Sequence, residues 1–182
     1  MEPQYRPNER EKLRKIIDEL SRLDYKELLS YWIVQETRKA EMYNSLSQLS
    51  EEVIWDERVS RLLKWLYEES INQAQLLLKA FKEQFHQEKP PQIEMPSLEI
   101  ELSEERLRNM VYRGNLQQVL DHLLEIESLA REVYRHLEEK ATNSEVRELF
   151  SKLSKRCEER IKSLETLYSA VLEKTQGEEP GV

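Results

Sequence analysis

The sequence predicts an all-α protein: a four-helix bundle of two helical hairpins joined by a long crossover, with two short extra helices. Apolar residues recur at the helical spacing of three and four residues over most of the chain. Only 3 of the 182 residues are glycines, which leaves little turn chemistry for a β-sheet with tight hairpins. The chain also repeats itself. Residues 36–43 read ETRKAEMY and residues 127–134 read ESLAREVY, so Glu, Glu and Tyr recur at the same spacing.

The first half of the chain opens with two helices. Residues 1–8 contain two prolines and form a lead-in, and a short amphipathic helix is expected at 9–23. Asp24 and Glu27 then make a capping box, which starts a second helix that runs to about Leu49. The residues predicted to be buried on this second helix are Leu28, Leu29, Trp32, Ile33, Ala40, Tyr43 and Leu46.

A third helix at 57–86 leads into a segment that breaks the helical pattern. Residues 87–102 read QEKPPQIEMPSLEIEL, and their three prolines oppose a helix. The segment is too long for a tight turn, so it predicts a crossover linker that travels the length of the bundle. The apolar positions of the third helix are Val59, Leu62, Leu63, Leu66, Leu77, Ala80 and Phe81.

The second half is expected to repeat the first. A short helix at 103–113 ends at Gly114, a residue that favours a left-handed cap. Asn115 and Gln118 form a second capping box, and the long helix that follows continues to about Ala141. Its apolar face carries Val119, Leu120, Leu123, Ala130, Tyr134 and Leu137, together with Glu127.

The last long helix begins near Asn143 or Ser144, and residues 173–182 are expected to be a frayed tail. Residues 1–172 therefore read as one domain, with an internal repeat at 9–86 and 103–172. The residues predicted to be buried on the last helix are Val146, Leu149, Phe150, Leu153, Leu164, Leu167 and Val171.

Composition and charge limit the function classes. The net charge is −8 and the isoelectric point is near 5.2, which argues against nucleic acid or an anionic membrane as the main partner. No apolar run reaches the roughly 18 residues that a membrane span requires. Cys157 is the single cysteine, so no intrachain disulfide can form, and the cytoplasm is the expected location.

Each copy of the repeat places a glutamate on the apolar face of its helix. Seven residues make nearly two helical turns, so Glu36 shares a face with Tyr43, and Glu127 shares a face with Tyr134. A carboxylate in a packed core must be protonated, paired with a cation or bound to a metal. Two such carboxylates at matching places in a duplication predict a polar site at the centre of the bundle.

These features resemble the rubrerythrin-like branch of the ferritin-like superfamily. The resemblance covers about residues 24–172 and rests on the two Glu-x6-Tyr helices, the two hairpins and the stretch NSEVRELFSKLSKRCEER at 143–160. It implies a di-iron centre to which the first and third long helices each contribute one Glu. The second and fourth long helices each contribute Glu-x-x-His. Such a centre activates oxygen or peroxide, or stores iron.

The residues that match this pattern give a mixed result. Glu36 and Glu127 match the two single-Glu positions. In the fourth long helix, however, Cys157 and Arg160 stand where the family has Glu-x-x-His. An arginine is permanently charged and cannot bind a cation, so Arg160 argues against a complete di-iron centre.

The second long helix can be aligned to the family pattern in two registers. An offset of 87 residues pairs five of its apolar positions with five in the last helix, and it places Ser70 and Gln73 at the ligand positions. This register is favoured. The rival register uses Glu69 and Asn72, which keeps a carboxylate but turns Asn72 away from the apolar face. Neither register provides a histidine, and the three histidines, His86, His122 and His136, are all expected at the surface.

The missing metal ligands lead to a specific hypothesis about Arg160. Without a metal, two buried carboxylates need another cation, and a guanidinium can bind both. We expect Arg160 to reach the bundle centre and to pair with Glu127, Glu36 or both. The other expected members of this polar network are Gln73, Ser70, Cys157, Tyr43 and Tyr134. Cys157 is expected to be a small core residue, although a nearby arginine could lower the pKa of its thiol.

The sequence therefore favours a structural or binding protein that holds no cofactor over an enzyme. The alternative is a metal-binding oxidoreductase or an iron-binding protein, in which Glu36, Glu69 and Glu127 would bind Fe or Mn through hard oxygen ligands. A third possibility is a pocket for a small ligand in place of the metal cavity.

The second long helix also carries apolar residues beyond its core-facing stripe, at Trp65, Tyr67, Ile71, Leu76 and Leu78. A second subunit would cover this surface, which makes a homodimer the expected assembly. Coverage by the two short helices and the crossover is the other possibility. The sequence does not identify a protein partner of another kind.

Overall fold

A computed structural model describes residues 7–53, 56–86, 88–113 and 116–176 of the chain. This part of the chain is all-α, as the sequence predicts: it forms six helices and no strand. The helices are α1 (Pro7–Leu20), α2 (Tyr25–Val53), α3 (Glu57–Phe85), α4 (Leu98–Arg113), α5 (Leu116–Lys140) and α6 (Ser144–Gln176).

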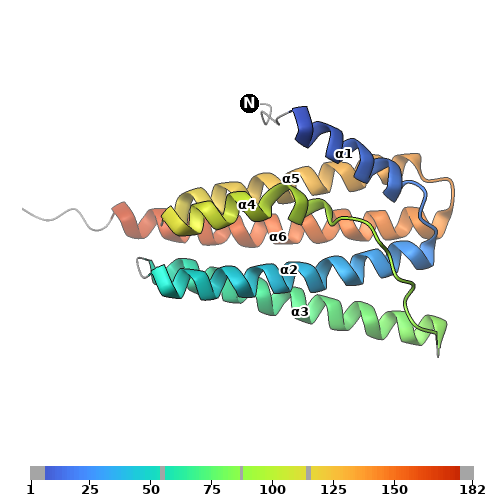
Figure 1. Cartoon of the computed structure of the whole chain (residues 1–182), viewed down its shortest axis with the longest axis horizontal. Coiled ribbons are helices and arrows are strands. Elements are labelled where there is room, and N and C mark those ends of the chain that lie inside the picture. Colours follow the sequence, from blue (N-terminus) through green and yellow to red (C-terminus); the bar gives the residue numbers. More distant parts are fainter. Residues whose placement is uncertain (1–6, 54–55, 87, 114–115, 177–182) are drawn as a thin grey trace, which may run out of the picture.

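The four long helices lie side by side in two antiparallel pairs, α2 with α3 and α5 with α6 (Figure 1). The connection between α3 and α4 runs from the far end of α3 across the molecule, and it lies against α2, where Arg38 Nη1 donates a hydrogen bond of 3.2 Å to the carbonyl of Met95. The short helices α1 and α4 lie on the α5 side and leave α3 uncovered (Figure 1). Of the two possible covers for the extra apolar residues of α3, the short helices therefore contribute little, because α4 lies mainly against α2 and α5, and α1 lies against α4 and α5.

The helix α4 begins earlier than the sequence predicts. Residues 98–102 were expected in the crossover, but they form the first turns of α4. The proline at position 96 is the last in this segment, and no residue after it opposes a helix. The amide of Glu101 already donates to the carbonyl of Ser97 at 3.1 Å. Glu99 is thereby placed on a helix that packs against α2 and α5.

The other helix ends differ from prediction by a few residues. The first helix starts at Pro7 and stops at Leu20, three residues before the predicted end, and α2 continues past Leu49 to Val53. Residues 173–176, expected in the frayed tail, still belong to α6. The predicted cap at Gly114 and the capping box at Asn115 lie outside the described residues.

Two predicted helix starts are confirmed by their hydrogen bonds. The amide of Asp24 donates to Glu27 Oε2 at 2.9 Å, and the amide of Glu27 donates to Asp24 Oδ1 at 2.8 Å, which is a complete capping box. At α6, Asn143 Oδ1 accepts from the amides of Glu145 and Val146 at 2.9 and 3.1 Å.

The hydrophobic core has two parts, one towards each end of the long helices. One cluster includes Trp32, Phe81 and Phe150, and the other includes Leu46, Leu63 and Leu120. Buried charged side chains lie between the two clusters on α2, which carries Glu36 and Lys39, and on α6, which carries Arg160. Leu167, predicted to be buried, is exposed, and so is Ala80 among the apolar positions of α3. The side chain of Val171, also predicted to be buried, lies outside the described ones. No helix among the described residues combines the length and apolarity needed to cross a membrane.

Candidate functional site

Arg160 on α6 lies at the centre of a charge network between the two core clusters. Its side chain is fully buried, and all three of its polar positions are bonded. Nη1 donates to Glu127 Oε1 on α5 at 2.9 Å, and Nη2 donates to Glu36 Oε2 on α2 at 3.3 Å. Nε donates to Glu69 Oε2 on α3 at 3.3 Å. One guanidinium thus binds a carboxylate from each of the other three long helices, including both glutamates that the sequence predicts.

Lys39 is a second buried cation in the network. Only 2% of its side chain is exposed, and it lies one turn after Glu36 on α2. Its Nζ is 2.9 Å from Glu36 Oε1 and 3.7 Å from Glu99 Oε1, so it bridges α2 and α4. Glu36 therefore has a cation on each of its two oxygens, Lys39 on one and Arg160 on the other.

Neutral polar groups complete the side of the network that faces α4. Gln35 Nε2 donates to Glu99 and also to the hydroxyl of Tyr134, which is 3.1 Å away. The hydroxyl of Tyr31 accepts from the amide of Leu98 at 3.3 Å. These bonds attach the first turn of α4 to α2 and α5, because each of them joins residues of different helices.

The network reaches solvent on the side of α3. Glu69 is 18% exposed, and its Oε1 accepts a bond of 2.7 Å from Nη2 of Arg156, which is 22% exposed. Arg156 also pairs with Glu159 at 3.2 Å. Arg156 therefore directs its charge at the network as well as at a carboxylate on its own helix.

Apart from the exposed Glu159, the network holds four carboxylates and three cations, which leaves one surplus negative charge. Burial alone would raise the pKa of Glu36, but Lys39 and Arg160 lower it to about 2. Glu99 behaves in the opposite way. Burial raises the pKa of its carboxyl, Lys39 opposes this, and the charges of Glu127 and Glu36 raise it further. A proton held by Glu99 would make the network neutral.

Lys39 and Arg160 stay charged despite their burial. Burial and the charge of Arg160 both lower the pKa of Lys39, yet Glu36, Glu99 and Glu127 together raise it above its ordinary value. Burial also opposes the charge of Arg160, and Glu127 and Glu36 more than offset it, so its pKa is raised. The positive charge of each side chain is therefore stabilised by the surrounding carboxylates rather than by water.

Cys157 is buried next to the network, and its thiol is not activated. Burial, with the charges of Glu127 and Glu99, raises the pKa of Cys157 well above its usual value, and Arg160 only partly opposes this. Arg160 and Lys39 do lower the pKa of the thiol, but burial and the two carboxylates raise it by more, so Cys157 is a buried core residue, as predicted. A neutral buried thiol is a poor nucleophile.

The predicted metal ligands do not form a free set. Glu36, Glu69 and Glu127 all direct an oxygen at Arg160, so the place between them is filled by a cation. A different group has the spacing of metal ligands: one donor atom each of Glu99, Glu127 and Cys157 lie within 4.8 Å of one another. Glu127 Oε2 is buried and accepts no hydrogen bond. However, a cation there would lie close to both Lys39 and Arg160, which bind the same carboxylates.

The remaining predicted members of the network have different outcomes. Ser70 is fully buried, but its hydroxyl has no hydrogen-bond partner. Gln73 is half-buried and makes no hydrogen bond with the network. The residue of α3 that binds Arg160 is Glu69, and not Gln73 as the favoured register predicts. Tyr134 joins the network through Gln35, whereas Tyr43 is buried among the same charges without a hydrogen bond to them. Asn72 of the rival register is exposed.

The histidines stay away from the network. His86 and His136 are exposed, as predicted. The prediction for His122 is wrong, because it is buried, with its Nδ1 at 3.9 Å from Glu125 Oε2 on its own helix.

Four network residues are not among the predicted ones: Gln35, Lys39, Glu99 and Arg156. The spacing of Lys39 from Glu36 is a usable signal, because residues three apart on a helix are neighbours. Glu99 could not be found in this way, since the prolines before it suggested an irregular segment. Arg156 lies four residues before Arg160, on the same side of α6.

No protein-family model and no curated protein matches this chain. Among solved structures, the fold is similar to that of a hypothetical protein from Pyrococcus furiosus, with a TM-score of 0.52 and 22% sequence identity. The alignment covers 86% of this chain and 96% of that chain. A likeness at this level of identity shows a shared all-α fold and carries no functional assignment.

Proposed function

We propose that this chain is a ferritin-like four-helix bundle of the rubrerythrin-like type, in which a salt-bridge network stands where the family has its di-iron centre. In this proposal the two antiparallel helix pairs are the two hairpins, and the connection from α3 to α4 is the crossover. The protein then acts as a structural or binding protein, and it has no oxidoreductase activity of its own.

The observation that carries the proposal is the position of Arg160. Its guanidinium binds Glu36, Glu69 and Glu127 at 2.9–3.3 Å, and these three carboxylates are the ones from which a metal site would be built. A guanidinium cannot lose its proton in a protein, so it cannot make room for a metal ion by becoming neutral. Lys39 binds the second oxygen of Glu36 and leaves that carboxylate fully occupied.

A second candidate function is a metal-binding oxidoreductase or iron-binding protein with Fe or Mn. One observation favours it: the unbonded Oε2 of Glu127 close to Glu99 and Cys157. This group could hold one cation, and a thiolate at Cys157 would supply the negative charge that balances it. We rank this function second, because two buried cations already bind its carboxylates.

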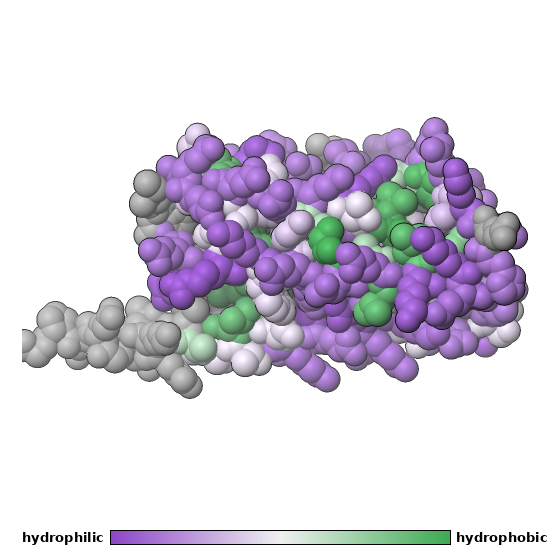
Figure 2. All heavy atoms as spheres, turned by 90° about the horizontal axis from the view of Figure 1, so that it is seen from below, coloured by the Kyte–Doolittle hydropathy of each residue, from purple (hydrophilic) through white to green (hydrophobic). Residues whose placement is uncertain are grey.

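A homodimer in the cytoplasm is the assembly that we propose for this protein. The outer side of α3 is free of the short helices, and it carries Leu76, which is 63% exposed. Figure 2 shows the α3 side of the molecule, where hydrophobic residues form several small groups among hydrophilic ones. A second copy could cover these groups, and sedimentation at the mass of two chains would support this arrangement.

An iron-oxidation assay tests the absence of oxidoreductase activity. We expect purified protein that is mixed with Fe2+ and then exposed to hydrogen peroxide to oxidise iron no faster than buffer does. The reason is that Glu36, Glu69 and Glu127 cannot bind Fe2+ while they bind Arg160. Iron oxidation that is faster than in buffer, and that Glu127→Gln abolishes, would contradict the proposal and favour the second candidate.

A further inference from the structure

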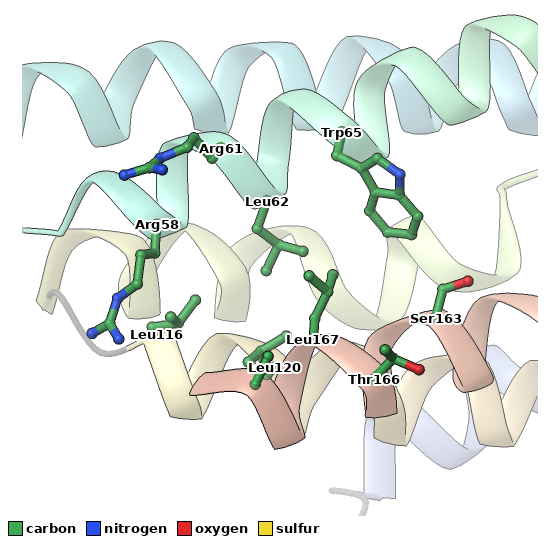
Figure 3. A pocket seen from close by; sticks show the side chains of 10 residues that line it. Arg58, Arg61, Leu62, Trp65, Leu116, Leu120, Ser163, Thr166 and Leu167 are labelled. Atoms are coloured by element: carbon green, nitrogen blue, oxygen red, sulfur yellow. The ribbon is translucent and has the colours of Figure 1, made fainter. Parts of the chain in front are cut away.

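A groove with a volume of about 610 Å³ lies between α3 and α6, close to the start of α5 (Figure 3). It is separate from the charge network, with which it shares no residue. Its volume is in the range of roughly 300–1,000 Å³ that is typical of small-molecule sites. The apolar residues that line it are Leu62, Trp65, Leu116, Leu120, Leu167 and Ala170.

The floor of the groove is part of the hydrophobic core. Leu62, Leu116 and Leu120 are nearly buried and belong to the second core cluster. Leu167 on α6 is 39% exposed, although its helical phase predicts a core position. The groove thus presents apolar side chains that no described part of this chain covers completely. A ligand with an apolar body would remove this surface from water.

The two ends of the groove differ in charge. Arg58 and Arg61 lie at one end, and Ser163 and Thr166 lie towards the other end, with the leucines between them (Figure 3). The hydroxyls of Ser163 and Thr166 donate to carbonyls of their own helix, at 3.1 and 2.9 Å. This end is therefore already satisfied in hydrogen bonds and suits an apolar group.

The charged end can bind an anion. The ion pair of Arg61 with Glu57 is 3.4 Å long, and the two side chains are 73% and 92% exposed. A pair of this kind contributes little, typically about 0–1 kcal/mol, so the guanidinium of Arg61 can turn to another carboxylate. Arg58 donates three side-chain hydrogen bonds to Asp56, which balances its charge, so Arg61 is the cation that we assign to the ligand.

We propose that this groove binds a medium-chain fatty carboxylate, with its alkyl chain on Leu62, Leu120 and Leu167 and its carboxylate at Arg61. The pairing of an apolar body with a single anionic end selects this class of molecule. A neutral alkane would leave Arg61 unused, and a cationic amphiphile would be repelled by it. The inference does not depend on the charge network, so it can hold or fail separately from the proposed function.

Titration with laurate by isothermal calorimetry tests the proposal, and tryptophan fluorescence reports the site because Trp65 lines the groove. We expect saturable binding of one laurate per chain, together with a change in tryptophan emission. Arg61→Glu should weaken binding at least tenfold, since it reverses the charge at the carboxylate end. Thr166→Phe should abolish binding, because it places a ring in the groove from an exposed helical position.

Lys79→Glu is the matched control for Arg61→Glu. Lys79 is also on α3, is also 73% exposed and also pairs with a glutamate one turn away, but it lies outside the groove. This variant should bind laurate within twofold of the wild type. Three results would overturn the proposal: no saturable binding of laurate, equal weakening by Arg61→Glu and Lys79→Glu, or equally tight binding of dodecyltrimethylammonium. A groove closed by a second copy of the chain would give the first of these results.

Discussion

Replacing Arg160 by methionine is expected to lower the free energy of unfolding by about 3–5 kcal/mol at pH 7, the usual cost of removing one partner of a buried ion pair. Methionine keeps much of the length of the side chain and removes its charge. Among the described residues, Arg160 is the only cation bound to Glu127, whereas Glu36 keeps Lys39 and Glu69 keeps Arg156. Most of the lost stability should therefore reflect the cost of leaving the Glu127 carboxylate buried without a cation. Since a typical domain is stable by only about 5–15 kcal/mol, the midpoint of urea denaturation should fall clearly.

The double variant Arg160→Met with Glu127→Gln tests this explanation. It removes the stranded charge along with its partner, so we expect it to recover at least half of the lost stability. Lys152→Met is the surface control: Lys152 lies on the same helix, is 57% exposed and pairs with Glu148 at 3.0 Å. It should change stability by less than about 0.5 kcal/mol. A loss below about 1 kcal/mol for Arg160→Met would show that Arg160 does not hold the network together.

Replacing Lys39 by methionine should have the next largest effect, about 3 kcal/mol, for the same reason. Lys39 lies 2.9 Å from Glu36 and 3.7 Å from Glu99, and no other cation in the described part of the chain pairs with Glu99. The double variant Lys39→Met with Glu36→Gln should recover most of the loss, because it removes one charge of each sign. Lys12→Met is the control. Lys12 on α1 pairs with Glu101, which lies on α4 as Glu99 does, and the distance of 3.7 Å equals that between Lys39 and Glu99. The side chain of Lys12, however, is 57% exposed. Equal losses for Lys12→Met and Lys39→Met would contradict the prediction.

The pH dependence of stability gives a second measurement of the same carboxylates. The pKa of Glu99 is raised in the folded protein, so its contribution is present below the ordinary value of 4.5 and is lost as the pH rises through its folded pKa. Glu99→Gln removes this loss, and stability should then fall less than in the wild type as the pH rises above 4.5. Glu36 has the opposite sign: its pKa is lowered to about 2, so its contribution is lost as the pH falls from 4.5 towards 2. A wild-type profile identical to that of Glu99→Gln would contradict the assignment of the surplus proton to Glu99.

The helical repeat makes the centre of the network predictable from the sequence. A repeat fixes the phase of each helix, and the phase places Glu36, Glu127 and Arg160 on faces that must meet. Ser70 also follows this rule and is fully buried. Its neighbour Glu69 does not follow it. Glu69 lies one residue away from the core-facing stripe of α3. Its side chain is long enough to reach Arg160 from the edge of that stripe, which the helical phase alone does not show.

The side of the network that faces α4 could not be predicted in the same way. It depends on where α4 begins, and the prolines of the preceding segment hide that boundary. Once the helix starts at Leu98, Glu99 points into the site and needs Lys39 and Gln35 as partners. Tertiary packing decides which side chains of distant helices pair with one another. The spacing of apolar residues along each helix does not reveal this packing.

The metal content of protein purified from iron-supplemented cells tests most directly whether Arg160 takes the place of a metal. Because the guanidinium lies between Glu36, Glu69 and Glu127 and binds an oxygen of each, we expect elemental analysis to find iron and manganese close to zero per chain. About two iron atoms per chain, the content of a di-iron carboxylate protein, would contradict the proposal.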